Sequence, residues 1–590
     1  MSGYLMKMLS ALFVGLIVFV FGLVLDKTGF HVEMMSAFMW GVVFAFGTYA
    51  VMIPSVFKRI KHVCCDLDWA EETIEFYRSI PKVYRKSFWM LFLFINLAFL
   101  FYTINFMWGN EDWGAMRFAV NPHESLKSGD FSAYWLQELI FDGKLLPVIN
   151  NLWAFAGLSL SGVLLAVYWD VPRRVMPIVV MGLLFAVTPY TLSVCYFAKT
   201  MLGMCFLPAM VLTALLLSHN RSDFEIKNYL YNLISVLLFI WAMGTYMPVI
   251  DFIILAILGK MFLKVVYADI SLSDAGKRVV QGVVNLTAAV MIYVFILFIL
   301  KETGRLNAVN SQALSLNTPL LSLPVFVKYM FLQFGQPMPF MDMFYRLVYL
   351  LMVLLALFAV IFKAPNVKAS IRGLGLLPFL LMATMLALLF IAEPAAHFGR
   401  ISFFGLPFFY ALMFVVLIRL SGSYLCRLTY LMAIVLIFMN FVRVSYAQKV
   451  WKFGWDAETK LAERIITRLE KMPEFNIDVK YKLLQVGEQS LRSKYYQKKT
   501  HELYNGELLG RAYYPAGDAK EAYNFFYQTD FLEGDDKDEA LKEPAIRNYL
   551  LNGARAWPYK ESLFIYGKYI VIILDDNALS LLQKKINDEN

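Results

Sequence analysis

Two adjacent carboxylates, Glu111 and Asp112, stand between Trp108 and Trp113, directly after a long apolar stretch of the chain. Tryptophan favours the boundary between water and lipid, so one interpretation is an interfacial aromatic belt with two solvated acids. The other is catalytic. Partial burial and a neighbouring like charge raise the basicity of a carboxylate, which suits it to remove a proton from a reacting hydroxyl. The pair is therefore a candidate general base at the edge of a membrane.

A second polar cluster, Glu393 to Arg400, forms a tight turn between two apolar stretches and includes His397. The planar guanidinium of Arg400 suits phosphate oxygens, although an arginine here could also reach out to lipid phosphate. Four further cations are expected on the same side of the membrane: Lys199, Lys301, Arg305 and Lys328. Positive charge is disfavoured on that side. Together these residues predict an anionic ligand at this membrane surface.

Other sequence signals are weak. The chain has no P-loop, no GxGxxG after a strand, no HExxH and no GxSxG, and its five cysteines show neither zinc spacing nor a disulfide framework. Asp251, three residues after Pro248, is interpreted as a packed polar contact more readily than as a proton relay. We therefore expect no metal and no cofactor.

The elements that must position these residues follow from the composition. The 590 residues are 59% hydrophobic and only 17% charged, with a mean hydropathy of +0.58. A single soluble core does not accommodate this excess, but a bilayer does. Residues 445–590 carry 22 basic and 23 acidic side chains, a net charge of −1, so that residues 1–444 carry +10 of the total formal charge of +9. We predict a membrane domain over 1–444 and a polar domain over 445–590. Nucleic acid is not implied, because basic loops are typical of membrane proteins.

Thirteen stretches are apolar and long enough to span a bilayer as helices. They are 6–25, 34–56, 88–107, 147–168, 175–195, 201–218, 229–245, 249–267, 281–300, 342–362, 374–392, 401–418 and 428–444. The connections at 196–200 and 246–248 are so short that either pair could be one broken hairpin that dips into the membrane.

The orientation follows from the loops. With the N-terminus in the cytoplasm, the inside segments carry 20 Lys and Arg residues and the outside segments nine. The C-terminal domain then lies on the far side, the periplasm of a Gram-negative bacterium. Its sequence predicts a helix over Trp455–Lys471 and strands within Ile477–Val486 and Ser562–Leu574. The fold class expected is a polytopic α-helical membrane protein with a small C-terminal α/β domain.

Three short motifs match a known pattern: Asn110–Gly114, Pro189–Tyr190 continuing through Tyr196 to Leu217, and Trp241–Tyr246. With about a dozen spans and an exported C-terminal domain, the chain resembles the GT-C glycosyltransferases. More narrowly, it is similar to the serotype-converting O-antigen glucosyltransferases of the type II Gtr-like group. The resemblance covers roughly residues 90–480.

The resemblance implies an inverting hexosyltransferase of the inner membrane that moves glucose from undecaprenyl phosphate to a lipid-linked O-antigen or similar envelope glycan on the periplasmic face. Asp112 would be the base, with Glu111 as the alternative. The donor phosphate would be bound by Arg400, His397, Lys199 and Arg305. The acceptor would be bound by Trp113, Arg117, Tyr246, Lys301 and Lys328, and by exposed aromatic residues of the tail, Tyr513, Tyr514 and Trp557. Functional partners would be an enzyme that makes the donor and a flippase that delivers it.

Three other functions remain open from the residues. A transporter or flippase for lipid-linked sugars would share the spans, but it would be expected to show internal repeats or helices interrupted at the midplane. No repeat is visible in the sequence. A polysaccharide polymerase or ligase would also carry exported basic residues, without needing the early carboxylate pair. A purely structural membrane protein is the third alternative.

Overall fold

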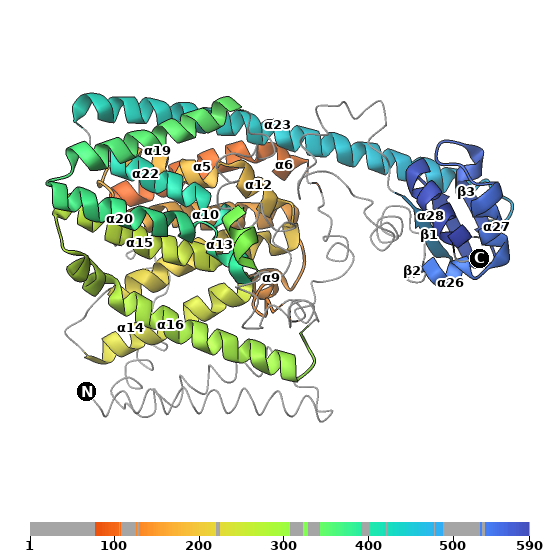
Figure 1. Ribbon diagram of the computed structural model, residues 1–590, viewed down its shortest axis with the longest axis horizontal. Coiled ribbons are helices and arrows are strands. Elements are labelled where there is room, and N and C mark those ends of the chain that lie inside the picture. Colours follow the sequence, from red (N-terminus) through yellow and green to blue (C-terminus); the bar gives the residue numbers. More distant parts are fainter. Residues whose placement is uncertain are drawn as a thin grey trace.

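The computed structural model has two parts, a bundle of helices and a small α/β domain, and helix α23 joins them (Figure 1). It describes residues 77–105, 107, 126, 129–219, 225–306, 322–328, 343–390, 402–420, 422–476, 478–487, 532–533 and 537–588.

The bundle is almost entirely helical in the described residues. Its elements are α5 (Lys82–Ala98), α6 (Leu100–Ile104), α9 (Trp135–Phe141), α10 (Pro147–Tyr168), α11 (Val175–Ala186), α12 (Pro189–Cys195), α13 (Ala198–His219), α14 (Glu225–Thr245), α15 (Val249–Ala268), α16 (Leu272–Glu302), α19 (Met343–Lys363), α20 (Val367–Ala383), the 3-10 helix η1 (Leu386–Phe390), α22 (Leu406–Leu420) and α23 (Ser423–Leu469). Within the described residues, every predicted stretch from 88–107 onward overlaps one or two helices. The stretches 6–25 and 34–56 lie outside the described residues.

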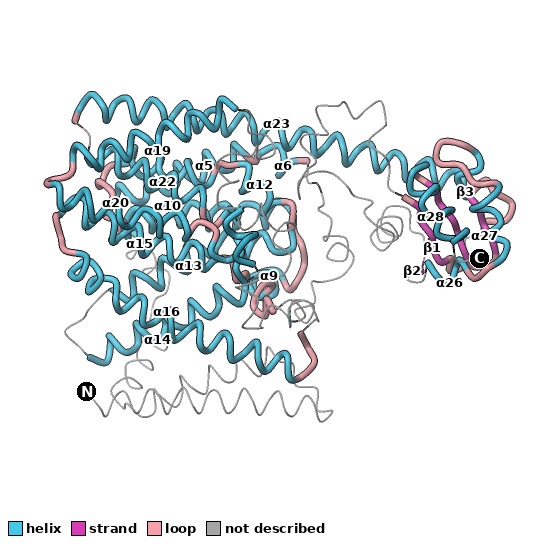
Figure 2. The backbone as a smooth tube through the Cα atoms, viewed as in Figure 1, coloured by secondary structure: helices cyan, strands magenta, loops and turns pink. Residues whose placement is uncertain are grey.

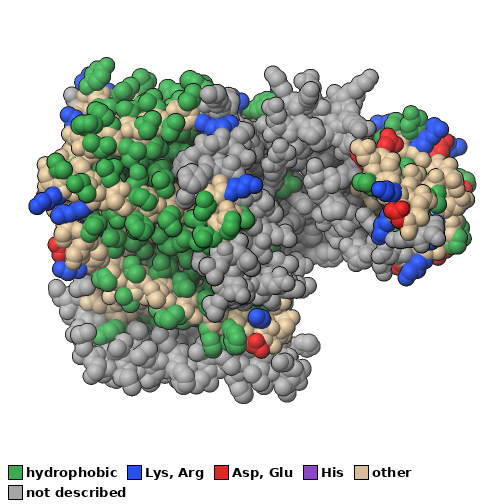
Figure 3. Space-filling model, viewed as in Figure 1, with side chains coloured by type: hydrophobic (Ala, Val, Ile, Leu, Met, Phe, Trp, Pro, Cys, Tyr) green, Lys and Arg blue, Asp and Glu red, His purple; other side chains and the backbone are tan. Residues whose placement is uncertain are grey.

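The described helices include six that are long and apolar enough to cross a membrane, or seven if the bent pair α11 and α12 is one span. The total of thirteen therefore stays a prediction. Large apolar side chains cover the outside of the bundle (Figure 3), for example Phe298, Phe362 and Phe438, each more than half exposed. A water-soluble surface rarely carries so extensive an apolar patch. The chain is a helical membrane protein.

One predicted span, 175–195, is not straight. It bends by 60° between α11 and α12. Thr188 begins the second helix: its Oγ1 accepts the backbone N–H of Thr191 at 3.4 Å, and Pro189 occupies the first helical position. Proline fits there because that position has no intrahelical partner for an N–H. The bend brings Cys195 and the residues after it to the end of the bundle.

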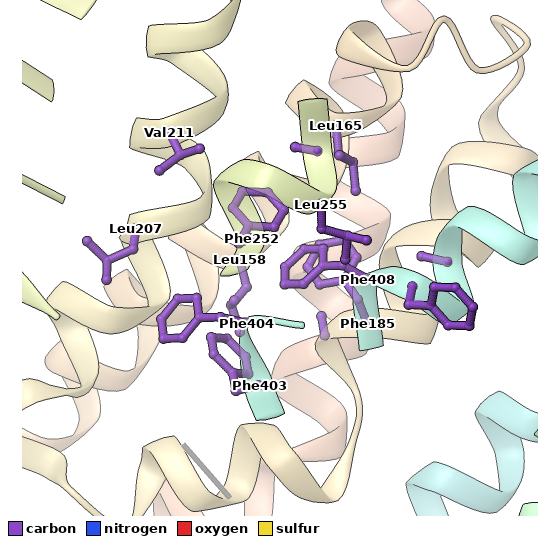
Figure 4. Close-up of a cluster of buried hydrophobic side chains, with 14 of the residues drawn as sticks. Leu158, Leu165, Phe185, Leu207, Val211, Phe252, Leu255, Phe403, Phe404 and Phe408 are labelled. Carbon is purple, nitrogen blue, oxygen red and sulfur yellow. The ribbon is translucent and has the colours of Figure 1, made fainter. Parts of the chain in front are cut away.

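Aromatic rings fill the centre of the bundle (Figure 4). The ring of Phe408 in α22 lies 4.4 Å from that of Phe185 in α11 and 4.3 Å from that of Phe252 in α15, between ring centroids. Close backbone contact adds to this packing, because a Cβ on Gly182 would lie 2.6 Å from a methyl carbon of Leu91 in α5. These contacts hold α5, α11, α15 and α22 as one body.

The C-terminal domain contains a four-stranded sheet with the order β2-β1-β4-β3 in the described residues. Its elements are β1 (Lys482–Val486), β2 (Leu532–Glu533), α26 (Lys537–Leu541), α27 (Pro544–Asn552), η2 (Lys560–Ser562), β3 (Leu563–Tyr566), β4 (Tyr569–Ile573) and α28 (Asp576–Asp588). Strand β1 runs parallel to β2 and β4, and β3 with β4 forms an antiparallel hairpin. The predicted small α/β fold of the tail is therefore present in these residues.

Helix α23 is 47 residues long, about 70 Å at the usual helical rise. It combines the predicted span 428–444 with the predicted tail helix Trp455–Lys471, and it continues unbroken through residue 445, where the composition changes. Its last turns pack on one face of the sheet through Leu461, Ile465 and Leu469. Helices α27 and α28 cover the other face.

Candidate functional site

One end of the bundle gathers most of the predicted site residues that the structure describes. At this end, which we call the Tyr246 end, α12, α14, α16 and α20 finish, and α10, α13, α15 and α22 begin. Helix α23 leaves the bundle on the same side and runs on to the C-terminal domain (Figure 2). Four helix N-termini, with the positive ends of their dipoles, and four helix C-termini, with the negative ends, therefore share this surface.

The motif Trp241–Tyr246 anchors the residues that follow the carboxylate pair in the chain. The backbone N–H of Ser132 donates to the carbonyl of Gly244 at 2.8 Å, and its hydroxyl donates to the carbonyl of Trp241 at 2.8 Å. A Cβ on Gly244 would overlap the ring of Phe131. This glycine is therefore needed for close approach of segment 129–134 to the end of α14.

The short break between α5 and α6 is fixed by a side chain of α23. Gln448 donates to the carbonyl of Ala98 at 2.9 Å and accepts the backbone N–H of Tyr102 at 2.8 Å. The hydroxyl of Tyr102 donates to the carbonyl of Cys195 at 2.9 Å, and its ring stacks on Trp451 at 5.3 Å. Helices α5, α12 and α23 thus jointly fix α6, the last described helix before Glu111 and Asp112 in the chain.

Buried polar side chains line the same region. Asn150 donates to the carbonyl of Ala198 at 3.3 Å, and Asn151 lies 3.5 Å from the hydroxyl of Thr103. Both Oδ1 atoms, and the indole nitrogen of Trp451, are buried without a hydrogen-bond partner among the described residues. Buried polar atoms of this kind are costly unless they have a function or a partner.

Asp251 is a fully buried carboxylate in the first turn of α15. One of its oxygens accepts the backbone N–H of Ala387 in η1 at 2.7 Å, and the other has no hydrogen-bond partner within the described ranges. The sequence interpretation of a packed polar contact is confirmed. The identity of the contact, an orphan N–H at the start of another helix, could not be predicted.

The four predicted cations that the structure describes lie on or beside three different helical segments. Lys199 lies half-buried in the first turn of α13, Lys301 is exposed in the last turn of α16, and Arg305 follows that helix. Lys328 is exposed in the helical segment 322–328.

Two aromatic contacts bring the rest of this surface together. Phe326 of segment 322–328 packs against Met385 and Leu388 beside η1, with Met247 next to them. The ring of Tyr246 lies 5.6 Å from that of Phe404, immediately before α22. Lys328 and Tyr246 therefore belong to the same end of the bundle.

Eight predicted site residues lie outside the described residues: Glu111, Asp112, Trp113, Arg117, His397, Arg400, Tyr513 and Tyr514. Their roles stay predictions, as do those of the five residues placed above. Within the described part of the chain, no group of three His, Cys, Asp or Glu side chains could hold a metal ion. Chemically, the described residues of this end offer four cations, Lys199, Lys301, Arg305 and Lys328, with the exposed acid Glu302 beside Lys301 in the chain.

Comparison with known families gives one match. A family model described as "Glucosyl transferase GtrII" matches residues 100–418, which is more than half of the chain. The matched region runs from α6 to α22 and includes every element of the Tyr246 end except α23. No curated protein and no solved structure matches the chain. By the extent of this match, the chain belongs to the glucosyl transferase GtrII family.

Proposed function

We propose that this protein transfers glucose from undecaprenyl phosphate to an O-antigen or similar envelope glycan, with inversion at the anomeric carbon. The observation that carries the proposal is the Tyr246 end itself. In a chain of a glucosyltransferase family, Lys199, Lys301, Arg305 and Lys328 lie at the end of the bundle where the described chain stops before residues 108–125 and 391–401, which include Asp112 and Arg400. We place this end at the periplasmic face of the inner membrane, with the N-terminus in the cytoplasm, because the loops of the opposite face carry most of the Lys and Arg residues.

The proposed reaction needs one base and one anion-binding surface. Asp112, with Glu111 as the alternative, takes the proton of an acceptor hydroxyl. The hydroxyl oxygen then bonds to the anomeric carbon from the face opposite the phosphate, and the carbon–oxygen bond to the phosphate breaks. Arg400 and His397, with Lys199 and Arg305, stabilise the negative charge that remains on undecaprenyl phosphate.

The acceptor would lie on the other side of the sugar. Trp113, Arg117, Tyr246, Lys301 and Lys328 are proposed to bind it. The donor itself supplies the leaving group, so the proposal includes no cofactor and no resident metal. An enzyme that makes the donor and a flippase that carries it across the membrane are the expected functional partners.

The test is transfer of radiolabelled glucose by the purified protein in lipid nanodiscs, from undecaprenyl-phosphate glucose to lipid-linked O-antigen repeats. Asp112→Asn should lower turnover by about a hundredfold or more while donor binding persists. Asp142→Asn is the matched control, because Asp142 is an exposed acid paired with Lys144 in the same stretch between α6 and α10.

Three results would contradict the proposal. Unchanged turnover in Asp112→Asn would exclude this residue as the base, and Glu111→Gln would then test the alternative. Lengthening of the acceptor by whole repeats would identify a polymerase. Movement of the donor across the bilayer without transfer would identify a transporter.

A further inference from the structure

A basic groove lies on the C-terminal domain, separate from the Tyr246 end. The last turns of α23 form one wall, and Trp557 stands opposite. The groove has a volume of about 620 Å³, and its lining residues are Lys460, Glu463, Arg464, Thr467, Arg468, Lys471 and Trp557. Four cations against one carboxylate leave it with a net charge of +3.

The spacing of these cations is unfavourable for the helix alone. Lys460, Arg464 and Arg468 follow one another at intervals of four residues, which places like charges next to each other on one face of α23. Among the described residues, no carboxylate forms an ion pair with Lys460, Arg464 or Lys471. The charge of this face is therefore available to an anionic ligand from solution.

Contacts with Trp557 fix two of the guanidinium groups in position. Arg468 lies over the indole ring at 4.2 Å from its centroid, and Arg464 lies at 5.3 Å. Arg468 also donates to the carbonyls of Pro558 and Tyr559 at 3.2 and 3.0 Å. Arg468 is thus engaged in holding the loop, whereas Arg464 is exposed and keeps its hydrogen-bond donors available. A pre-positioned guanidinium loses less freedom when it binds a carboxylate or phosphate.

The position of the groove along α23 excludes a lipid headgroup as its natural ligand. The apolar part of this helix ends at Lys449. Lys460 and Arg468 lie 11 and 19 residues further on in the same helix, which corresponds to about 17 and 28 Å along a straight helix. A ligand for this groove must therefore reach well out of the membrane, as a polysaccharide chain anchored in the membrane does.

We propose that this groove binds an acidic segment of the acceptor glycan, one that carries carboxylate or phosphate groups. The identification of the ligand as the acceptor rests on the proposed function. The binding site itself does not, because it can be measured without a donor and without transfer. The groove would hold the polymer by its charge, remote from the hydroxyl that receives glucose.

The experiment measures binding of short oligosaccharides to the full-length protein in phosphatidylcholine nanodiscs by isothermal titration calorimetry. The probes are a hexamer of galacturonic acid, a phosphorylated mannose oligomer and a neutral glucose hexamer. At least one acidic probe should bind at least tenfold more tightly than the neutral one, and its affinity should fall as salt is raised. Which acidic probe binds identifies the group that is recognised.

Variants test the groove itself. Lys460→Gln combined with Arg464→Gln should weaken binding of the acidic probe about tenfold or more, because two charge-assisted contacts are lost. Lys584→Gln, an exposed lysine of α28 outside the groove, is the matched control and should change binding less than twofold. Arg464→Lys should retain part of the affinity. Circular dichroism and thermal unfolding check that each variant is folded.

Two kinds of result would overturn the proposal. Equal binding of neutral and acidic hexamers, or equal binding by the folded double variant and the wild type, would show that the groove does not select acidic glycans. Full competition by phosphatidylglycerol vesicles, or by a hexamer of glutamic acid, would assign the groove to lipid or to a peptide. Loss of glucose transfer with intact binding would instead contradict only the proposed function.

Discussion

The carboxylate of Asp251 accepts the backbone N–H of Ala387 at 2.7 Å, although the two residues are 136 positions apart in the chain. This bond joins the first turn of α15 to the start of η1, the last described element before the segment with His397 and Arg400. A buried carboxylate is expensive to maintain unless it satisfies a partner. Here it satisfies an N–H at a helix start, so that the entry to the predicted phosphate-binding turn is tied to the core.

Replacement of Asp251 should separate the roles of its acceptor and its charge. Asp251→Ala removes the acceptor and should destabilise the protein by about 1–3 kcal/mol, because the buried N–H of Ala387 is left unpaired. Asp251→Asn keeps an oxygen at this position and should cost less. Thermal unfolding in detergent measures both. An unchanged midpoint in Asp251→Ala would show that the bond contributes nothing to stability.

The position of Gly405 should tolerate no side chain. A Cβ at this position would overlap the carbonyl oxygen of Thr384, a backbone atom that cannot move aside cheaply. We expect Gly405→Ala to lower the yield of folded protein sharply. Gly375→Ala is the matched control: nothing lies within 4 Å of a Cβ there, and Gly375 is inside helix α20. That control should stabilise the protein by about 0.5–1 kcal/mol. Equal behaviour of the two variants in unfolding experiments would contradict this account.

Gln448 should contribute both to the stability of the protein and to glucose transfer, although it lies on a membrane-spanning helix. Gln448→Leu introduces an apolar side chain of similar size and leaves the carbonyl of Ala98 and the N–H of Tyr102 without this partner. We expect a loss of about 1–3 kcal/mol in unfolding free energy. Glucose transfer should also fall, because α6 leads to the loop with Asp112. Val442→Ala changes an exposed residue of the same helix and should affect transfer little. Equal glucose transfer by the two variants would show that the contacts that hold α6 do not affect the reaction.

The sequence predicted the helices well because a span requires about 20 apolar residues, and such stretches are easy to recognise. It did not predict the bend between α11 and α12, although Thr188 and Pro189 carry a helix-start signal, because the apolar content continues across them. The sequence also predicted two separate helices, 428–444 and Trp455–Lys471, where the structure has the single helix α23. Residues 445–454 lose their apolar character but keep helical propensity, and only the packing of the tail on the sheet shows that the helix continues.

The site was predicted only at the level of residue types. Basic residues on the disfavoured side of the membrane could be counted from the sequence, and those that the structure describes lie at one end of the bundle. The partners of Asp251 and Gln448 could not be predicted, because each contact joins segments more than 130 residues apart. The groove beside Trp557 could not be predicted as a groove either, because it depends on how the loop after α27 folds back on α23.

The ion pairs of Glu539 should make the stability of the C-terminal domain depend on pH. Its carboxylate accepts a hydrogen bond from Lys482 and lies 3.6 Å from the ammonium of Lys568. The bond from Lys482, followed by the two positive charges, lowers the pKa of Glu539 below its ordinary value of 4.5. A lowered pKa in the folded state stabilises the fold above the unfolded-state pKa, and this contribution is lost as pH falls through the folded-state value.

Glu539→Gln should therefore lower the unfolding midpoint of the full-length protein at about pH 7, and this difference should shrink as the pH falls through the lowered pKa of Glu539 and the carboxyl becomes neutral. The difference at about pH 7 should be small and should shrink in high salt, because the pair is exposed to solvent. Glu474→Gln, which removes an acid that forms no ion pair in the described part of the chain, serves as the control. A midpoint difference for Glu539→Gln that persists unchanged once the carboxyl is neutral would mean that packing of the side chain, rather than its charge, stabilises β1 against α26.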